Sequence, residues 1–461
     1  MQHVYDLVVV GSGPGGTRAA FTAAAAGLKT AMVEAGFLGG TCLNSGCIPT
    51  KFLLGGTNFL PLLRMQAKFG TIQCEPQVDF AALQARKERF LKGSRQALEK
   101  RLAGAGITLV RGRAAFSGER ELTVKGPEPI VLTFDKCILA VGSTPSSIPG
   151  LKPDGAAVLA PASVLNLKEA PESLIIVGAG PIGLELGDFF YRLGCAIQLV
   201  EGMPRVLPGE DEETGEFMGA YLARSGRQLF LGRKIAGLCT RDDQAELTFE
   251  DGEIIRASRA MVAVGRRPAI SGLAVEAAGL APGAGGRPET DGFLRLSPHV
   301  YGVGDVNGRM PLAGAADHQG EYAARHAAGL TDAPYAPPAM PLCIYGAMEV
   351  LRVGPTLRSL RSTACGELRV SRATAAANPL AQASGHTQGF LQAIWDDGLL
   401  RSIVAVCHEA SHLGAAAALL VERKFRYGDL SPIVFAHPTL DENLKNLLEA
   451  PMEPAQLYDK L

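Results

Sequence analysis

The sequence predicts an α/β fold with two Rossmann-like domains and an α+β C-terminal domain. A strand, a glycine-rich turn, a helix, a second strand and an acidic residue follow one another at two separate places in the chain. At roughly 100–200 residues per domain, a chain of 461 residues corresponds to about three domains. After residue 341 the chain contains short apolar runs that are typical of antiparallel strands.

The first repeat begins close to the N-terminus. The apolar run Leu7–Val10 leads into the turn Gly11-Ser-Gly-Pro-Gly-Gly16, and an alanine-rich stretch that favours a helix follows. A second apolar run, Thr30–Val33, ends at Glu34. The second repeat contains, in the same order, Ser173–Val177, Gly178-Ala-Gly-Pro-Ile-Gly183, Leu184–Leu193, Ala196–Val200 and Glu201.

Each repeat is a dinucleotide-binding fingerprint with a physical basis. Glycine permits the tight turn and lets bare backbone approach a pyrophosphate, and the helix N-terminus offers N–H groups and a positive dipole. The carboxylate after the second strand accepts hydrogen bonds from ribose hydroxyls. Two fingerprints imply two dinucleotides, and electron transfer between them is the simplest reason to hold both. Glu201 would repel a 2′-phosphate and so favours NAD, although the nearby Arg205 leaves NADP open.

Composition excludes several classes of protein. The 45 basic and 46 acidic residues leave a formal charge of −1, which argues against a dedicated nucleic-acid binder. We expect no membrane-spanning helix, because apolar runs stay below the ~18–20 residues that a bilayer requires. The nine cysteines are too sparse for a secreted disulfide scaffold and favour a reducing cytoplasm. Glycine accounts for 55 of 461 residues, above the usual ~7%, which indicates tight turns and backbone close to ligands.

Further elements are expected outside the repeats. The charged stretch Phe80–Leu102 has a helical pattern, and the Pro- and Ala-rich segment Tyr335–Pro341 is typical of a linker. In the C-terminal part, the predicted strands are Leu368–Val370, Gly389–Ile394 and Ser402–Val406, and the predicted helices are Gly414–Lys424 and Asp441–Leu448.

One close pair of cysteines, Cys42 and Cys47, follows the first repeat. On a regular α-helix, Cα atoms of residues five apart lie roughly 8–9 Å from each other, whereas a disulfide needs no more than about 7 Å. The pair can therefore close only where the helix is distorted, and Asn44-Ser45-Gly46 is suited to distortion. Two thiols supply only half of a zinc site. Spacing alone leaves two unrelated cysteines possible, and the position beside a dinucleotide site favours a redox pair.

The surrounding segment, Gly39-Gly-Thr-Cys-Leu-Asn-Ser-Gly-Cys-Ile-Pro-Thr-Lys51, resembles the active-site signature of the pyridine-nucleotide disulfide oxidoreductases, and most of all that of the members that oxidise dihydrolipoyl groups. The resemblance covers nearly the whole chain, including both fingerprints. It also includes Leu207-Pro-Gly-Glu-Asp211, Gly265-Arg266 with Pro268, Gly302-Val-Gly-Asp305 and His437-Pro-Thr-Leu-Asp-Glu442. One departure is Tyr345-Gly-Ala-Met-Glu349, where the family usually has Tyr-Thr-x-Pro-Glu.

The resemblance implies a role for each motif. Cys42 would exchange with substrate, and Cys47 would be the thiolate against the flavin. Lys51 would lie near the flavin and pair with Glu185 from the second repeat. The implied FAD contacts are Gly11, Gly13, Pro14, Gly15, Gly16, Glu34, Thr41, Cys42, Lys51, Ser143, Asp305 and Ala313. The implied NAD contacts are Gly178, Gly180, Ile182, Gly183, Glu201 and Gly265.

His437 and Glu442 have the residue types of a base and its orienting carboxylate. Dithiol chemistry needs a base because the thiolate is the nucleophile and an ordinary thiol is mostly protonated at neutral pH. A carboxylate on the other ring nitrogen would fix the tautomer of the imidazole. The resemblance implies that this pair reaches the disulfide of the partner subunit, so that activity would require a homodimer.

A competing motif, His408-Glu-Ala-Ser-His412, matches the zinc-protease pattern HExxH. That pattern requires both histidines on one face of a helix, and His408 directly follows a predicted strand. We therefore expect no metal site.

The sequence thus predicts four segments. They are the first part of an FAD-binding domain (1–149), an NAD-binding domain (150–270), the second part of the FAD-binding domain (271–340) and a C-terminal dimerisation domain (341–461). The expected enzyme oxidises dihydrolipoyl groups of a lipoyl-carrier protein or domain with NAD, through FAD and the Cys42–Cys47 disulfide. The alternative is an NAD(P)H-dependent reductase of another disulfide or thiol-bound substrate.

Overall fold

The structure is a computed structural model that describes residues 3–73, 76–146, 148–281, 283 and 287–458. The chain divides into two compact units. The first comprises Met1–Phe52, Ala81–Ser146 and Gly265–Pro337, and the second comprises Leu53–Phe80, Ser147–Val264 and Pro338–Leu461. The segments predicted to bind FAD fall mainly in the first unit. The segment Leu53–Phe80, placed by the sequence in the FAD part, groups with the second unit.

A mostly parallel sheet forms the centre of the first unit. Its strands are β1 (His3–Val10), β2 (Thr30–Glu34), β3 (Thr108–Arg111), β4 (Arg113–Gly118), β5 (Glu121–Lys125), β6 (Ile130–Leu139) and β17 (Val300–Gly302). They run in the order β3-β2-β1-β6-β5-β4, and β17 also pairs with β6. The pairs β1–β2, β2–β3, β1–β6 and β6–β17 are parallel, whereas β4, β5 and β6 form antiparallel pairs. The strands that precede and follow the first glycine turn therefore lie side by side, as a Rossmann fold requires.

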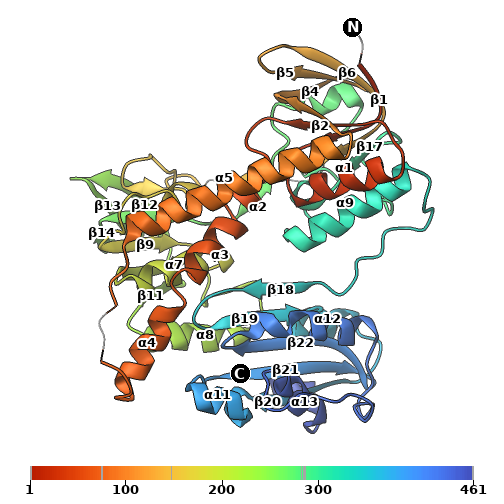
Figure 1. Ribbon diagram of the computed structural model, residues 1–461. Coiled ribbons are helices and arrows are strands. Elements are labelled where there is room, and N and C mark those ends of the chain that lie inside the picture. The colour runs from red at the N-terminus through yellow and green to blue at the C-terminus, as the bar shows by residue number, and fades with distance from the viewer. Residues whose placement is uncertain (1–2, 74–75, 147, 282, 284–286, 459–461) are drawn as a thin grey trace. The chain divides into compact units, whose positions relative to one another are not determined.

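Helices α1 (Pro14–Ala25) and α9 (Ala313–Ala327) lie side by side in the first unit (Figure 1). Small residues allow this approach, because a Cβ on Gly15 would lie only 2.9 Å from the carbonyl oxygen of Ala316. Buried alanines of both helices share one core with alternate residues of β1. Helix α5 (Phe80–Gly104) confirms the helix predicted at Phe80–Leu102. Helix α2 (Gly40–Asn44) lies in the first unit, α3 (Cys47–Gly55) begins there and ends in the second unit, and α4 (Phe59–Lys68) belongs to the second unit.

The second unit contains a parallel sheet built on the second repeat. Its strands are β8 (Val158–Leu159), β9 (Ser173–Val177), β10 (Ala196–Glu201), β11 (Gln228–Leu231) and β15 (Arg259–Val262). Their order is β11-β10-β9-β15-β8, and each neighbouring pair is parallel. The associated helices are α6 (Pro161–Val164), α7 (Pro181–Arg192) and α8 (Glu212–Arg224). Proline is favoured in the first turn of a helix, and it opens both α1 and α7.

Two smaller sheets accompany the Rossmann sheets. Strands β12 (Ile235–Arg241), β13 (Gln244–Phe249) and β14 (Ile254–Ala257) form an antiparallel sheet in the second unit. Strands β7 (Ser143–Pro145) and β16 (Arg266–Pro268) form an antiparallel pair in the first unit. This pair brings together two segments that are far apart in the sequence, and β7 begins at Ser143, a predicted FAD contact.

The C-terminal part of the second unit is an antiparallel sheet. Its strands are β18 (Pro341–Ile344), β19 (Glu349–Val353), β20 (Leu368–Thr374), β21 (Gly389–Asp396), β22 (Leu399–Cys407) and β23 (Glu453–Pro454), in the order β18-β19-β22-β21-β20-β23. Its helices are α10 (Leu357–Thr363), α11 (Pro379–Ser384), α12 (Gly414–Glu422) and α13 (Glu442–Glu449). Helices α12 and α13 contribute to one core with β19, β21 and β22.

The predicted C-terminal strands and helices are confirmed, each within a few residues of its predicted bounds. The predicted linker contains no helix or strand before Pro341, where β18 begins. Strands β18 and β19 lie outside those predicted from the sequence. Among the described residues, no helix is both long and apolar enough to cross a membrane.

Candidate active site

In the first glycine turn, backbone atoms lie too close together for side chains at two of its glycines. Gly11 has φ +101°, a conformation that favours glycine, and a Cβ there would lie 2.4 Å from the carbonyl oxygen of Ala140. A Cβ on Gly16 would lie 1.9 Å from the carbonyl oxygen of Gly11. Both positions therefore require glycine for the fold of the turn itself.

The second turn repeats this geometry. Gly178 has φ +107°, and a Cβ there would lie 2.4 Å from the carbonyl oxygen of Ala263. A Cβ on Gly183 would lie 2.0 Å from the carbonyl oxygen of Gly178. The sequence repeat is thus a structural repeat of the same backbone turn.

The central glycine of each turn has a different environment. Gly13 and Gly180 are the N-cap residues of α1 and α7, and both have extended backbone with negative φ. A Cβ at either position would meet no protein atom within 4 Å. These glycines leave bare backbone at a helix N-terminus, which fits the pyrophosphate of a dinucleotide.

Glu34 connects the end of β2 to the first glycine turn. Its carboxylate accepts hydrogen bonds from the backbone N–H of Ser12 at 2.9 Å and of Gly36 at 2.7 Å. The Ser12 hydroxyl also donates to it, at 2.5 Å. A carboxylate held in this way keeps further lone pairs that can accept from ribose hydroxyls.

Glu201 has the same arrangement in the second repeat. It accepts from the backbone N–H groups of Ala179 and Met203, each at 2.9 Å. The cation that would favour a 2′-phosphate, Arg205, lies 3.6 Å from the carboxylate of Glu212 at the start of α8. This geometry agrees with the preference for NAD that Glu201 indicates.

The two cysteines lie on either side of a break between two helices. Cys42 lies in α2, and Cys47 is the first residue of α3. The C-cap of α2, Ser45, has φ −149° and ψ 20°, which is far from helical backbone. The distortion that the spacing requires is therefore confirmed at Asn44-Ser45-Gly46.

The surroundings of Cys42 shift the pKa of its thiol. A hydrogen bond with Cys47, followed by burial, raises the pKa of the Cys42 thiol, while the charge of Lys51 acts in the opposite direction. Cys42 is half-buried, whereas Cys47 is exposed. The raised pKa favours a proton on Cys42 in a reduced pair.

Asn44 lies between the two cysteines and forms hydrogen bonds with the backbone before them and with α5. Its amide donates to the carbonyl oxygens of Leu38 at 2.9 Å and Gly40 at 2.8 Å. Its own carbonyl accepts from Arg95 of α5 at 3.0 Å. From the sequence, Asn44 was expected only to favour the helix distortion between the two cysteines. Its position between them could have indicated a structural role, but its partner Arg95 lies in α5, far away in the sequence.

Asp305 and Ser143, two predicted FAD contacts, lie together in the first unit. The Ser143 hydroxyl donates a short hydrogen bond to Asp305. Arg266 donates to the Ser143 hydroxyl at 2.7 Å and to its carbonyl oxygen at 2.6 Å, and lies 4.0 Å from Asp305. Burial lowers the pKa of Arg266, and the charges of Asp305 and Cys47 act in the opposite direction. The sequence placed Arg266 in a family motif without assigning it a role.

His437 and Glu442 form the expected pair in the second unit. The imidazole Nδ1 lies 3.0 Å and 3.2 Å from the two carboxylate oxygens of Glu442. The hydrogen bond with His437, followed by one from the backbone N–H of Thr439, lowers the pKa of Glu442. A carboxylate on Nδ1 leaves Nε2 of the imidazole for proton transfer.

The HExxH motif has no helical geometry. His408 follows β22 directly, and His412 lies in the 3₁₀ turn Ala410–Leu413. Over the ranges that the structure describes, no three His, Cys, Asp or Glu side chains are grouped to hold a metal ion. The ring of His408 is stacked on that of His386, with 3.6 Å between centroids.

The other predicted residues have defined positions but untested roles. Lys51 lies in α3, and Glu185 is buried on α7, where it accepts from the backbone N–H of Tyr345 at 3.2 Å. Gly265 has φ +110°, and its carbonyl oxygen accepts from the N–H of Ser146. Thr41 lies in α2, Pro14 and Gly15 open α1, Ile182 lies in the first turn of α7, and Ala313 opens α9.

Comparisons with known proteins agree with this geometry. Residues 5–320 match the pyridine nucleotide-disulphide oxidoreductase family, and residues 340–448 match the dimerisation domain of that family. Dihydrolipoyl dehydrogenase of Chlorobaculum tepidum is 35% identical over 450 residues, which cover 96% of either chain. Dihydrolipoyl dehydrogenase of Bacillus subtilis is 32% identical over 453 residues, which cover 96% of this chain and 97% of the relative.

Two solved structures share the fold. LpdA from Mycobacterium tuberculosis gives a TM-score of 0.88 at 24% identity, covering 97% of this chain and 99% of that one. The HOCl-induced flavoprotein disulfide reductase RclA from Escherichia coli gives 0.85 at 25% identity, covering 96% and 99%.

The chain belongs to the pyridine nucleotide-disulphide oxidoreductase family. It is a flavin-dependent disulfide oxidoreductase that uses FAD and NAD and carries the dimerisation domain of the family.

Proposed function

We propose that this enzyme oxidises dihydrolipoyl groups of a carrier protein or domain and transfers the electrons to NAD. The observation that carries the proposal is the asymmetric pair Cys42 and Cys47, placed across a helix break directly after the first dinucleotide turn. The dihydrolipoyl dehydrogenases that match over almost the full chain support the choice of substrate. Glu201 supports NAD over NADP.

The first chemical step is an exchange between a substrate thiol and the disulfide. His437 accepts the proton of one substrate thiol, and the resulting thiolate attacks the sulfur of Cys42. The Cys42–Cys47 bond breaks, and Cys47 leaves as a thiolate. The second substrate thiol loses its proton to solvent and attacks the mixed disulfide. The substrate then leaves as a disulfide, and the released Cys42 takes the proton held by His437. The substrate loses two electrons and the enzyme pair gains them.

When bound, FAD would supply the two-electron redox chemistry that links the reduced cysteine pair to the nicotinamide. Residues of the first turn, together with Glu34, Ser143 and Asp305, would hold the FAD. The bare backbone at Gly13 and the anchored Glu34 carboxylate fit such a group. Residues of the second turn and Glu201 would hold NAD.

The proposed role of His437 depends on its pairing with Glu442. Glu442 holds Nδ1 of His437 and stabilises the imidazolium that forms when Nε2 takes a proton. We propose that His437 acts on the disulfide of the other subunit in a homodimer, and that the enzyme works in the cytoplasm.

Steady-state kinetics tests the proposal directly. The enzyme should oxidise dihydrolipoamide with NAD at a kcat/KM at least about tenfold above that with NADP, a difference of about 1.4 kcal/mol. The alternative is an NAD(P)H-dependent reductase of another disulfide, and glutathione disulfide with NADPH is its assay. Turnover of glutathione disulfide with NADPH, without turnover of dihydrolipoamide, would establish the alternative.

A further inference from the structure

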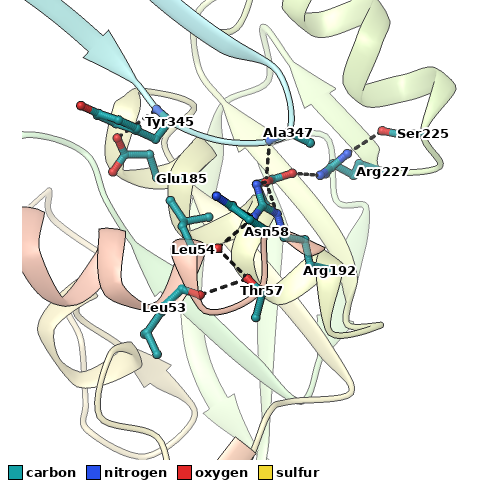
Figure 2. A network of polar contacts seen from close by, with 11 residues as sticks. Leu53, Leu54, Thr57, Asn58, Glu185, Arg192, Ser225, Arg227, Tyr345 and Ala347 are labelled. Carbon is teal, nitrogen blue, oxygen red and sulfur yellow. Dashed lines mark hydrogen bonds and ion pairs between the residues drawn. The ribbon is translucent and has the colours of Figure 1, made fainter. Parts of the chain in front are cut away.

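Helix α7 has a buried polar face that dinucleotide binding does not require. Glu185, Asp188 and Arg192 follow the spacing of residues on one helix face. All three are buried, at 6%, 6% and 3% exposure, which is unusual for charged side chains. Figure 2 shows the polar contacts around this face, with Glu185 beside Tyr345 and Arg192 beside Asn58.

Asp188 is the centre of these contacts. One carboxylate oxygen accepts from Arg192, with Nε at 2.8 Å and Nη2 at 2.7 Å, and from the backbone N–H of Ala347 at 3.0 Å. The other oxygen accepts from Arg227 at 2.5 Å. Arg227 is in turn stacked on the ring of Tyr191, with Cζ 3.7 Å from the centroid. A carboxylate with two guanidinium partners and a backbone donor is held in one position.

Arg192 extends this network to the end of α3. Its Nη1 donates to the carbonyl oxygen of Leu54 at 3.1 Å and to the side-chain oxygen of Asn58 at 2.7 Å. Leu54 lies in the last turn of α3, where carbonyl groups have no partner within the helix and where a positive charge is favourable. The buried Thr57 hydroxyl donates to Leu53 and Leu54 as well, at 3.0 and 3.1 Å.

Arg192 binds the end of the helix that carries the proposed redox residues, which we call the redox helix. Helix α3 begins at Cys47 and contains Lys51 one turn before Leu54. Helix α3 is one continuous helix of nine residues, so its backbone hydrogen bonds connect its last turn to its first. The other end of the same α7 face carries Glu185, the predicted partner of Lys51.

The departure from the family pattern at residues 345–349 is part of the same network. Tyr345 and Ala347 donate their backbone N–H groups to Glu185 and Asp188. A Cβ on Gly346, between them, would lie 3.4 Å from a carboxylate oxygen of Asp188 and 3.2 Å from the carbonyl oxygen of Met348. A glycine at this position lets the backbone approach α7 closely.

We propose that Asp188 and Arg192 are positioning residues for the redox helix. Arg192 holds the last turn of α3 against α7, and Asp188 orients Arg192 through a hydrogen bond and an ion pair. This clamp, defined as Asp188, Arg192 and their contacts with Leu54 and Asn58, keeps Cys47 and Lys51 in the geometry that electron transfer to the flavin requires. The inference rests on the proposed function only in that Cys47 is the thiolate next to the flavin.

The experiment compares hydrogen exchange and the absorption spectrum of the FAD-loaded enzyme with those of two variants. Arg192→Gln removes the hydrogen bond with Leu54 in α3 and the hydrogen bond with Asn58, the N-cap residue of α4. Asn58→Ala removes one of them at an exposed position and leaves the ion pair intact. Amide exchange in 47–55 is measured by mass spectrometry, and the thiolate–flavin absorption band is measured after reduction with dithiothreitol.

The matched control breaks a different buried ion pair of the same unit. Glu210 is 7% exposed and binds Arg352 at 2.6 Å, without contact to α3 among the hydrogen bonds of the described residues. Glu210→Gln therefore disturbs stability without disturbing the clamp.

The proposal predicts that α3 exchanges at least about tenfold faster in Arg192→Gln and that the absorption band loses roughly half of its intensity. Asn58→Ala should change the same quantities less, and Glu210→Gln should leave them at wild-type values. Wild-type exchange in α3 of Arg192→Gln, or an equal change in Glu210→Gln, would overturn the proposal. If Arg192→Gln does not fold, Asn58→Ala decides, and unchanged exchange there overturns the clamp. Neither readout uses a lipoyl substrate, so a failure of dihydrolipoamide turnover in the wild type would reject the proposed function and leave this result standing.

Discussion

A substitution at Gly180, the central glycine of the second turn, should weaken NAD binding with little effect on folding. Gly180 has φ −80° and ψ −175°, extended backbone that any residue can adopt. A Cβ there meets no protein atom within 4 Å, so Gly180→Ala should introduce no clash in the folded protein. Because alanine is a poorer N-cap than glycine, we expect a loss of at most about 1 kcal/mol.

Gly183, in the same turn, should behave differently. A Cβ at this position would lie 2.0 Å from the carbonyl oxygen of Gly178, far inside normal contact, and the obstacle is backbone that cannot rotate away. Gly183→Ala should therefore cost about 1–3 kcal/mol or more, the range for overpacking a closed site. The two substitutions add the same methyl group and differ only in what that group meets.

The methyl group of Gly180→Ala would occupy the bare backbone where the pyrophosphate is predicted to lie. We expect NAD binding to weaken at least tenfold, which is about 1.4 kcal/mol, while the melting temperature shifts by no more than about 4 °C. Isothermal titration calorimetry on the FAD-loaded enzyme measures the first quantity, and thermal unfolding the second.

Gly219→Ala is the control for this experiment, because Gly219 lies in α8 of the same unit and its nearest atom to an added Cβ is 4.0 Å away. It should leave NAD affinity unchanged. If folded Gly180→Ala binds NAD with wild-type affinity, the pyrophosphate does not lie on this N-cap and the assignment of the second turn is wrong.

Three further outcomes follow from the structure. Asp188→Asn should lower the free energy of unfolding by about 3–5 kcal/mol in a denaturant titration, because it leaves two buried guanidinium groups uncompensated, and a change below about 1 kcal/mol would contradict this. Gly93→Ala, at an exposed position inside α5 with no atom within 4 Å of its Cβ, should raise the free energy of unfolding by about 0.5–1 kcal/mol, and a lower urea midpoint would count against it. Burial, with the charge of His408 acting in the same direction, lowers the pKa of His386 to about 4. The unfolded state, with a pKa near 6.5, binds more protons between these values, so stability should rise as pH increases from about 4 to about 6.5. His386→Gln should flatten that rise, and an unchanged pH profile would show that His386 is not its source.

The two dinucleotide turns were predictable because their causes are local. A glycine that must have positive φ, a proline that opens a helix and an acid at the end of a strand are all visible within about thirty residues. The same is true of the break between Cys42 and Cys47, since helix geometry alone forbids an undistorted pair from closing. His437 and Glu442 are close in sequence, and their hydrogen bond is confirmed.

The parts that the sequence did not provide depend on contacts between distant segments. Arg266 reaches Ser143 because β16 pairs with β7, and Arg192 reaches Leu54 because α7 packs against the end of α3. No periodicity or motif specifies these partners. A charged residue on the apolar face of a predicted helix, such as Asp188 on α7, is the one signal that could have indicated a buried network, because such a residue must be paired when buried.

The central claim is that electrons from a dihydrolipoyl group pass through the Cys42–Cys47 pair to NAD. Anaerobic rapid mixing of the oxidised enzyme with one equivalent of dihydrolipoamide tests it most directly. We predict that the thiolate–flavin absorption band appears at once and that later addition of NAD removes it, with formation of one equivalent of NADH. Cys42→Ser should prevent the reduction by dihydrolipoamide. NADH formation by Cys42→Ser at the wild-type rate, or no reduction of the wild-type enzyme by dihydrolipoamide, would contradict the account.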